Sequence, residues 1–112
     1  MPTPTLQSFL DHQIHTGTIL SATLNEKAHK PAYILKIDFG PDLGIKTSSA
    51  QITENYQPAD LINTQILAVT NFPPKKIAGI KSEVLVLAAV CKKNNTVLIK
   101  PSAQVQNGSK VL

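Results

Sequence analysis

The spacing of the apolar residues changes near residue 14. Before that point, Leu6, Phe9 and Leu10 recur at the i, i+3 and i+4 positions of one helix face, which predicts a short amphipathic helix. From Ile14 onward, β-branched residues dominate with a period of two, which is typical of a strand. Gly17 interrupts this run, and a glycine inside a strand commonly marks a bulge or a sharp bend. We therefore expect a first strand that starts at Ile14 and has a bulge or a sharp bend at Gly17.

Further strands are predicted wherever the period of two continues. The clearest is AYILKIDFG, in which apolar residues from Tyr33 to Phe39 alternate with polar ones. The segment SEVLVLAAV, residues 82–90, is a near-continuous apolar run and is therefore predicted to be a strand buried on both faces. The remaining predictions are strands at 43–52, 65–72 and 97–101, a short helical connector at 53–63, and a tail at 104–112 that pairs or docks.

Five or six short strands, with a helix inserted between the third and the fourth, are typical of a small Greek-key barrel. We therefore predict an all-β protein, a five-stranded OB-type barrel with short helices at the N-terminus and between strands three and four. Residues 1–13 are interpreted as a helical leader that packs on its own domain or on a twin subunit. Residues 14–112 are interpreted as the barrel, because a chain of 112 residues agrees with a single domain.

Other features of the sequence bear on the setting in which the protein works. No apolar run approaches the ~20 residues that a membrane helix needs, and the start, MPTPTLQSFLDHQ, lacks the basic and apolar regions of a signal peptide. The single cysteine, Cys91, cannot form an internal disulfide. We therefore expect a cytoplasmic protein that is not inserted in a membrane.

The positive charge is concentrated in the second part of the sequence. Residues 1–74 carry four Lys against six Asp and Glu, whereas residues 75–112 carry seven Lys and one acidic residue, Glu83. The basic segment 75–112 is either a binding surface for phosphate backbones and other anionic partners or a solvated lysine face. The sequence contains no Arg, so a nucleic acid would be contacted through its backbone and shape rather than through guanine edges.

The stretch NFPPKKIAGIKSEVLVLA, residues 71–88, places prolines, lysines and a Ser-Glu pair beside a predicted strand. The prolines stiffen the loop and remove two backbone donors. One interpretation is a small polar pocket in which ammonium groups attract a ligand, polar side chains orient it and an aromatic ring adds apolar contact. The other is a Lys–Glu pair on an ordinary loop, which stabilises little when exposed. The predicted ligand-binding residues are Asn71, Phe72, Lys75, Lys76, Lys81, Ser82 and Glu83.

A second polar cluster is KTSSAQI, residues 46–52. Its two serines, Ser48 and Ser49, could donate hydrogen bonds to phosphates or to a peptide backbone. Equally, they could cap a short helix that starts near Thr53. Both interpretations remain open at this point, and the two serines are included in the predicted site for an RNA or peptide ligand.

No catalytic or metal-binding motif stands out in the sequence, so we predict a protein that is not an enzyme and has neither a cofactor nor a metal. His12 and His15 straddle the change from helix to strand and are interpreted as surface residues. Cys91 precedes Lys92 and Lys93, and neighbouring cations can lower the pKa of a thiol. The sequence leaves open whether Cys91 is reactive or only structural.

Three runs resemble the CsaA family: KIDFGPDLGIKTSSAQIT, NFPPKKIAGIKSEVLVLA and QVQNGSKV. This family consists of small proteins related to the tRNA-binding OB domain that is also appended to some aminoacyl-tRNA synthetases. The run QIHTGTI resembles the family's entry motif D-I-R-V-G-x-I at Ile14, Gly17 and Ile19, and departs from it at Gln13, His15 and Thr16. The resemblance covers roughly residues 9–112.

The resemblance implies an OB barrel and several properties that the spacing does not show. Members are cytoplasmic homodimers whose terminal segments help to form the interface. CsaA-type members are described as chaperones in protein export that bind unfolded or precursor polypeptides. The wider family binds tRNA through the region that matches residues 71–83. The leading hypothesis is therefore a CsaA-like homodimeric chaperone that retains a tRNA-binding-type pocket, and the alternative is a tRNA-binding module with no chaperone role.

Two departures from the tRNA-binding pattern weaken the alternative. Ala78 occupies the place where many relatives carry an Arg, so one phosphate-binding fork is missing. Val84 and Leu85 occupy the place of a Gly-Met pair. The chain also holds few aromatic residues on which bases could stack, so tRNA or another structured RNA would have to be recognised by shape and charge.

Overall fold

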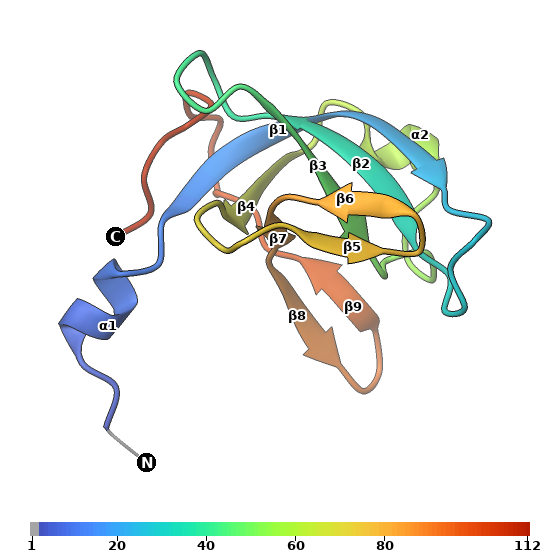
Figure 1. The fold of residues 1–112 in the computed structure, drawn as a ribbon, viewed down its shortest axis with the longest axis horizontal. Coiled ribbons are helices and arrows are strands. Elements are labelled where there is room, and N and C mark those ends of the chain that lie inside the picture. The colour runs from blue at the N-terminus through green and yellow to red at the C-terminus, as the bar shows by residue number, and fades with distance from the viewer. Residues whose placement is uncertain (1–2) are drawn as a thin grey trace.

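A five-stranded antiparallel sheet in the order β3-β2-β1-β4-β7 carries the fold. The computed structural model describes residues 3–112, and Figure 1 shows β1 and β2 arching over the other elements. Two hairpins, β5-β6 and β8-β9, are paired separately. The bounds are α1 Leu6–Leu10, β1 Ile14–Leu24, β2 Tyr33–Asp38, β3 Ile45–Ala50, α2 Pro58–Leu61, β4 Gln65–Val69, β5 Lys75–Ile77, β6 Ile80–Ser82, β7 Leu85–Val86, β8 Ala88–Cys91 and β9 Asn95–Leu98.

The sheet curls into a nearly closed barrel, which confirms the predicted OB-type fold. Its two edge strands meet where Glu83 N–H, just before β7, donates to Thr47 C=O of β3 at 2.7 Å. The long strand β1 makes the curl possible because its first half pairs with β4 and its second half with β2. The barrel interior is filled by side chains that are at most 1% exposed: Ile19, Leu35, Ile37, Phe39, Leu61 and Ile66. Burying each of them stabilises the fold by roughly 1.5–3 kcal/mol.

Of the bulge or sharp bend predicted at Gly17, the bulge is wrong. Gly17 pairs in register with Ile66, and the irregularity in β1 falls between Ile19 and Ser21. The glycine serves packing instead, because a Cβ built on it would lie 2.7 Å from both Ile37 Cγ2 and Phe39 Cδ1. Gly17 therefore lets core side chains approach the backbone of β1 closely, which is another common reason for a glycine inside a strand.

The predicted strand at 82–90 is not one strand buried on both faces. It is divided among β6, β7 and β8, and only Ser82 and Val84 in it are buried. Leu85 is 50% exposed and Val90 is 87% exposed. The physical reason is that the chain leaves the barrel after Leu87 and pairs with β9 in a hairpin that projects beyond it (Figure 1).

The helical connector is shorter and later than predicted. Residues 53–55 form a turn, and α2 begins only at Pro58, where a proline is well tolerated in the first helical turn. Leu61 is the one residue of α2 that is buried, and it packs in the barrel core. The connector therefore contributes one side chain, Leu61, to the barrel core.

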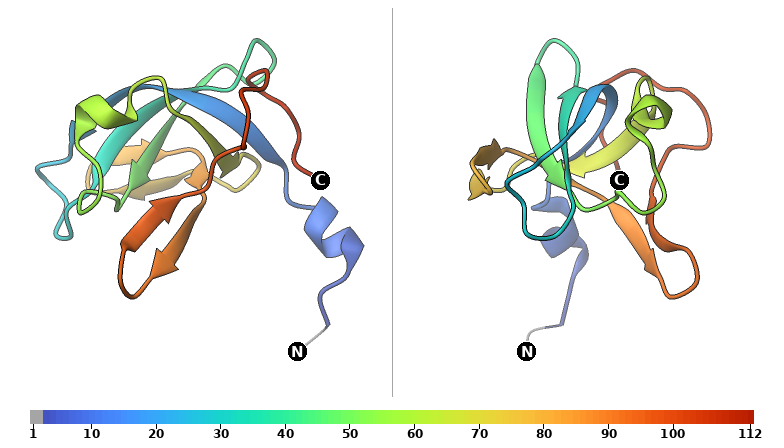
Figure 2. Two further views of the ribbon diagram at one scale, coloured as in Figure 1. Left: turned by 180° about the vertical axis from the view of Figure 1, so that it is seen from behind. Right: turned by 90° about the vertical axis from the view of Figure 1, so that its right-hand side faces the viewer.

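Helix α1 and the end of the C-terminal tail lie at the same side of the barrel (Figures 1 and 2). The tail docks as predicted, since Gly108 N–H donates to Thr16 C=O at 2.7 Å and Val111 N–H donates to Ile14 C=O at 2.9 Å. The predicted helix α1 is also present, and Thr5 and Ser8 form its capping box. None of the residues of α1 is buried. Within residues 3–112, no helix is long and apolar enough to span a membrane.

Candidate functional site

A small pocket brings together four of the residues predicted from the sequence. Phe72, Lys75, Ser82 and Glu83 line a cavity of about 180 Å³ between β5 and β7. The other lining residues, which the sequence did not single out, are Pro73, Ile77, Val84 and Leu85. The pocket therefore combines an apolar lining with one ammonium group and one carboxylate.

The rim of this pocket presents apolar surface to solvent. Phe72 is 40% exposed and Leu85 is 50% exposed. Phe72 is held by His12, whose ring lies 5.6 Å away in an edge-to-face arrangement. A partly exposed aromatic ring with a fixed orientation is suited to contact with an apolar group of a ligand.

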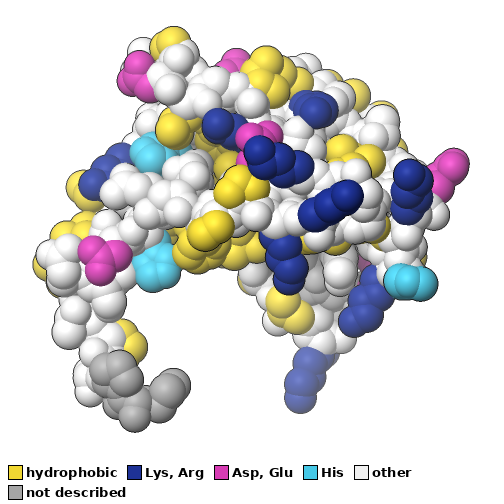
Figure 3. All heavy atoms as spheres, viewed as in Figure 1, with side chains coloured by type: hydrophobic (Ala, Val, Ile, Leu, Met, Phe, Trp, Pro, Cys, Tyr) yellow, Lys and Arg dark blue, Asp and Glu magenta, His cyan; other side chains and the backbone are white. Residues whose placement is uncertain are grey.

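Lysines surround the β5-β6 hairpin. Lys75, Lys76 and Lys81 are exposed on it, with Lys76 directly opposite Lys81. Three further lysines come from the acidic half of the sequence: Lys27 lies against the turn at Gly79, Lys46 against Glu83, and Lys36 against Thr47. Figure 3 shows several lysine side chains on this face of the molecule. The sequence could not reveal the second group, because only the fold places it beside the hairpin.

Ser82 and Glu83 also close the barrel. Glu83 Oε1 accepts a hydrogen bond from Thr47 N–H at 3.1 Å, and Ser82 Oγ accepts one from Ser49 N–H at 3.0 Å. These two donors lie on the outer edge of β3, which would otherwise be unpaired. The lysine that approaches Glu83 is Lys46, at 4.0 Å, rather than a lysine of the 71–81 loop. Ser82 and Glu83 thus line the pocket and also join the two edges of the sheet.

The two serines of β3 have different positions. Ser48 is 1% exposed, and its hydroxyl donates to Val84 C=O at 3.0 Å, so it faces the interior. Ser49 is half-buried, and its backbone is bonded to Ser82. Neither serine caps a helix, because α2 begins only at Pro58 and its N-cap residue is Gln57. That interpretation of KTSSAQI is wrong, and neither serine lines the pocket at Phe72.

Asn71 is engaged elsewhere. Its side-chain amide donates to Asp11 C=O at 2.9 Å and accepts from Gln13 N–H at 2.9 Å. Asn71 is not among the residues that line the pocket. It links the lysine-bearing loop to the junction between α1 and β1, so the position of the N-terminal helix and that of the loop are connected.

The histidines and the cysteine are not brought together. His15 Nδ1 lies 2.9 Å from Thr70 Oγ1, and burial together with the charge of Lys110 lowers the pKa of His15. Backbone hydrogen bonds from Asn94 and Lys93 lower the pKa of Cys91, so the cause is the turn itself rather than the neighbouring ammonium groups. Within residues 3–112, no group of three or more His, Cys, Asp or Glu residues is arranged to hold a metal ion.

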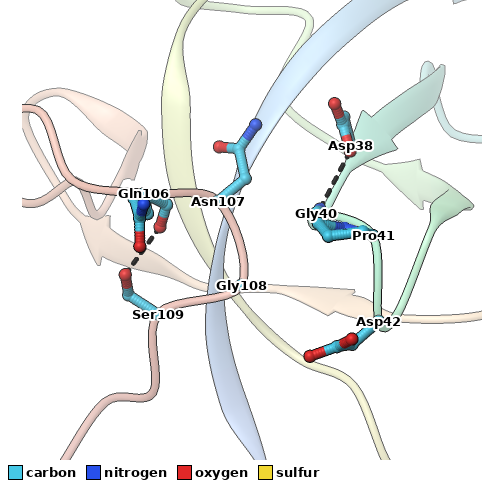
Figure 4. Close-up of a pocket in the computed structure, with 8 residues that line it drawn as sticks. All are labelled: Asp38, Gly40, Pro41, Asp42, Gln106, Asn107, Gly108 and Ser109. Atoms are coloured by element: carbon cyan, nitrogen blue, oxygen red, sulfur yellow. Dashed lines mark hydrogen bonds between the residues drawn. The ribbon is translucent and has the colours of Figure 1, made fainter.

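A cavity of about 520 Å³ lies on another part of the molecule, between the β2–β3 turn and the tail (Figure 4). Asp38 Oδ1 accepts from Gly40 N–H at 2.9 Å and Ser109 Oγ donates to Gln106 C=O at 2.6 Å. Two glycines with positive φ interlock the two turns, since a Cβ on Gly40 would lie 2.6 Å from Asn107 O and one on Gly108 would lie 2.5 Å from Phe39 O. This cavity therefore follows from the docking of the tail.

Comparison with known proteins identifies a family. Residues 14–110 match the family described as "Putative tRNA binding domain". Among curated proteins, a methionine--tRNA ligase of Porphyromonas gingivalis is 33% identical over 105 residues, which is 94% of this chain and 15% of the ligase. The chain thus spans about one seventh of the length of that relative, and the ligase activity belongs to a protein far longer than this chain.

Two solved structures match over almost the whole chain. Chaperone CsaA from Bacillus anthracis str. Ames is 47% identical, with a TM-score of 0.92, over 99% of this chain and 100% of that one. The CsaA chaperone protein from Picrophilus torridus is 44% identical, with a TM-score of 0.93, over 98% of this chain and 100% of that one. Both similarities include the segments that carry the pocket and the lysines.

Proposed function

Because the chain belongs to the tRNA-binding domain family and, within it, to the CsaA family, we propose that it is a homodimeric molecular chaperone. It binds unfolded or precursor polypeptides in the cytoplasm and assists their export. The observation that carries this proposal is the pocket between β5 and β7, in which an apolar lining meets an ammonium rim.

The pocket has the chemistry that an unfolded polypeptide requires. Ile77, Val84 and Leu85 offer apolar surface to a side chain that a folded protein would bury. Lys75 at the rim attracts a carboxylate of the same polypeptide. Recognition of this kind depends on residue class rather than on a defined sequence, which suits a chaperone with many clients.

A dimer would present the pocket twice. The apolar stripe of α1 supports a dimer, because Leu6 is 74% exposed and Phe9 is 39% exposed on a helix with no buried residue. A two-fold arrangement gives both subunits the same contacts. A long unfolded chain could then occupy both pockets and gain affinity through effective concentration.

Binding of a reduced, carboxymethylated polypeptide tests the proposal. Leu85→Asp should weaken this binding by about tenfold, since it places a carboxylate in the apolar lining. Ile62→Asp is the matched control, because Ile62 is 45% exposed, close to the 50% of Leu85, and does not line the pocket. Equal affinities for the two variants and the unmodified protein would exclude the pocket as the polypeptide site.

The lysine face favours a second candidate function, binding of tRNA or another structured RNA. Three lysines lie on the β5-β6 hairpin and a fourth lies against its turn: Lys75, Lys76, Lys81 and Lys27. Lys46 lies beside Glu83, which follows β6, and Lys36 lies beside Thr47 of β3. Phosphate contacts by lysine position an RNA without reading its sequence. Such a complex should lose affinity steeply between low and physiological salt, whereas polypeptide binding in the apolar pocket should change little.

A further inference from the structure

The strand that runs through β7 and β8 has one bonded edge and one open edge. Leu87 N–H donates to Leu67 C=O of β4 at 2.9 Å, and Leu87 C=O accepts from Ile99 N–H, just after β9, at 3.2 Å. Backbone groups of successive residues in a strand point to opposite edges. The groups of Val86, Ala88 and Val90 therefore point to the other edge, and within residues 3–112 no hydrogen bond reaches them there.

The outer edge of the neighbouring strand is protected, which makes the open edge of β7-β8 notable by contrast. The side-chain amide of Asn55 donates to Thr96 C=O at 2.8 Å, and Tyr56 Oη accepts from Leu98 N–H at 3.0 Å. These two side chains occupy the positions that a further strand beside β9 would need. Proteins commonly cover the edges of a sheet that should not pair. The hairpin is thus closed on the β9 side and open on the β8 side.

A cavity lined by six apolar and three polar residues accompanies the open edge. It measures about 300 Å³ and lies between residues 49–52, at the end of β3, and the hairpin. Ala88 and Leu98 line it, and Val90 continues the same face of β8 with 87% exposure. Leu85 lines both this cavity and the pocket at Phe72, so the two hollows adjoin.

We propose that an extended polypeptide segment adds to the open edge of β7-β8 as a further strand and places alternate apolar side chains in the adjoining cavity. This rests on the proposed function and specifies how a client is held. A row of donors and acceptors on every second residue is complementary to another backbone in the extended conformation. RNA has no such row.

Charge adds a preference for acidic residues at one end of the segment. The open edge of β8 leads directly to Lys92 and Lys93, which are both exposed at the tip of the hairpin. Among the described residues, the one ion pair is that of Lys46 with Glu83, so neither ammonium group has a carboxylate of its own chain beside it. A bound segment with an acidic residue at this end would supply one.

Fluorescence anisotropy with synthetic peptides tests the inference on the unmodified protein. The probe is a labelled octapeptide in which Val and Thr alternate between an Asp at each end. Two further probes carry N-methyl groups on alternate residues, one on the even and one on the odd positions. We expect one methylated probe to lose about tenfold to a hundredfold in affinity and the other to bind like the parent, because only one set of N–H groups faces β8.

The other outcomes separate this inference from the proposed function. If both methylated probes bind like the parent, the segment enters the cavity without pairing and the inference is wrong, while the proposed function stands. If the parent peptide does not bind but the carboxymethylated polypeptide does, the inference is again wrong. If neither binds, the proposed function fails as well. A probe with Lys in place of both Asp residues should bind less tightly than the parent.

A protein variant tests the same edge from the other side. Ala88→Pro removes an N–H that makes no hydrogen bond in the hairpin, so the fold should survive, as a thermal unfolding curve will show. Affinity for the parent octapeptide should fall by about tenfold. If the variant instead converts a dimer to a monomer in sedimentation, a second copy of the chain occupies this edge and the inference is wrong.

Discussion

Glu83 and Thr47 are joined through both backbone and side chain. Glu83 N–H donates to Thr47 C=O at 2.7 Å, and Thr47 N–H donates back to Glu83 Oε1 at 3.1 Å. Glu83 thereby makes the two hydrogen bonds that a residue of a neighbouring strand would make with Thr47, at the place where the barrel closes. The same residue lines the pocket at Phe72, so closure of the barrel and the shape of the candidate site depend on one side chain.

Glu83→Ala should lower the free energy of unfolding by about 1–3 kcal/mol, because it leaves Thr47 N–H without a partner. Glu83→Gln should recover most of that loss, since the amide oxygen can still accept from Thr47, while the ion pair with Lys46 at 4.0 Å stabilises little at the surface. Urea unfolding of the three proteins measures the difference. If Glu83→Ala is as stable as the unmodified protein, the pair does not hold the barrel closed.

The stability should fall on acidification because of His15. Burial and Lys110 lower the pKa of this residue in the folded state below its ordinary value of 6.5, so the unfolded state binds the proton more readily. The contribution is therefore fully present above pH 6.5 and is lost as the pH falls from 6.5 toward the folded pKa. His15→Asn should flatten the dependence of the unfolding midpoint on pH in this window. An unchanged slope would assign the effect to other groups.

Replacing Lys75 and Lys76 together by Ala should weaken RNA binding about equally for unrelated RNA sequences, because lysines contact the backbone. The slope of log K against log salt should become shallower by up to about two. Lys100→Ala with Lys110→Ala removes the same charge outside the β5-β6 hairpin and serves as the control. Equal losses in both double variants would indicate general charge attraction rather than a site at the hairpin.

Removal of residues 1–10 should weaken dimerisation, because the apolar stripe of α1 would be lost from the interface. Leu6→Asp with Phe9→Asp should have the same effect without shortening the chain, whereas Gln7→Asp, on the same helix, should have little. Sedimentation velocity at several protein concentrations distinguishes a monomer from a dimer. A shortened protein that still sediments as a tight dimer would place the interface elsewhere.

The sequence predicted the strands of the barrel well where one face is buried, as in Tyr33 to Phe39, because the period of two is then strong. It could not predict the exit of the chain from the barrel after Leu87, since Leu85 and Val90 are as apolar as core residues but lie on a projecting hairpin. Of the predicted ligand-binding residues, Phe72, Lys75, Ser82 and Glu83 lie together around one pocket.

The remaining parts of the site depend on contacts between distant residues. Asn71 is bonded to Asp11 and Gln13, and Ser48 is turned into the interior toward Val84. Neither arrangement leaves a signal in the local pattern of polar residues. The same holds for Lys27, which reaches the β5-β6 turn from a separate loop.

A parallel titration across a salt series tests the chaperone proposal most directly. The protein is titrated with a reduced, carboxymethylated polypeptide and, separately, with a tRNA pool at salt concentrations from about 50 to about 200 mM. We expect polypeptide binding that changes little with salt and is weakened by Leu85→Asp, together with weaker tRNA binding. Tight tRNA binding that falls steeply with salt and is lost when Lys75 and Lys76 are replaced, together with no polypeptide binding, would contradict the chaperone proposal and identify an RNA-binding protein.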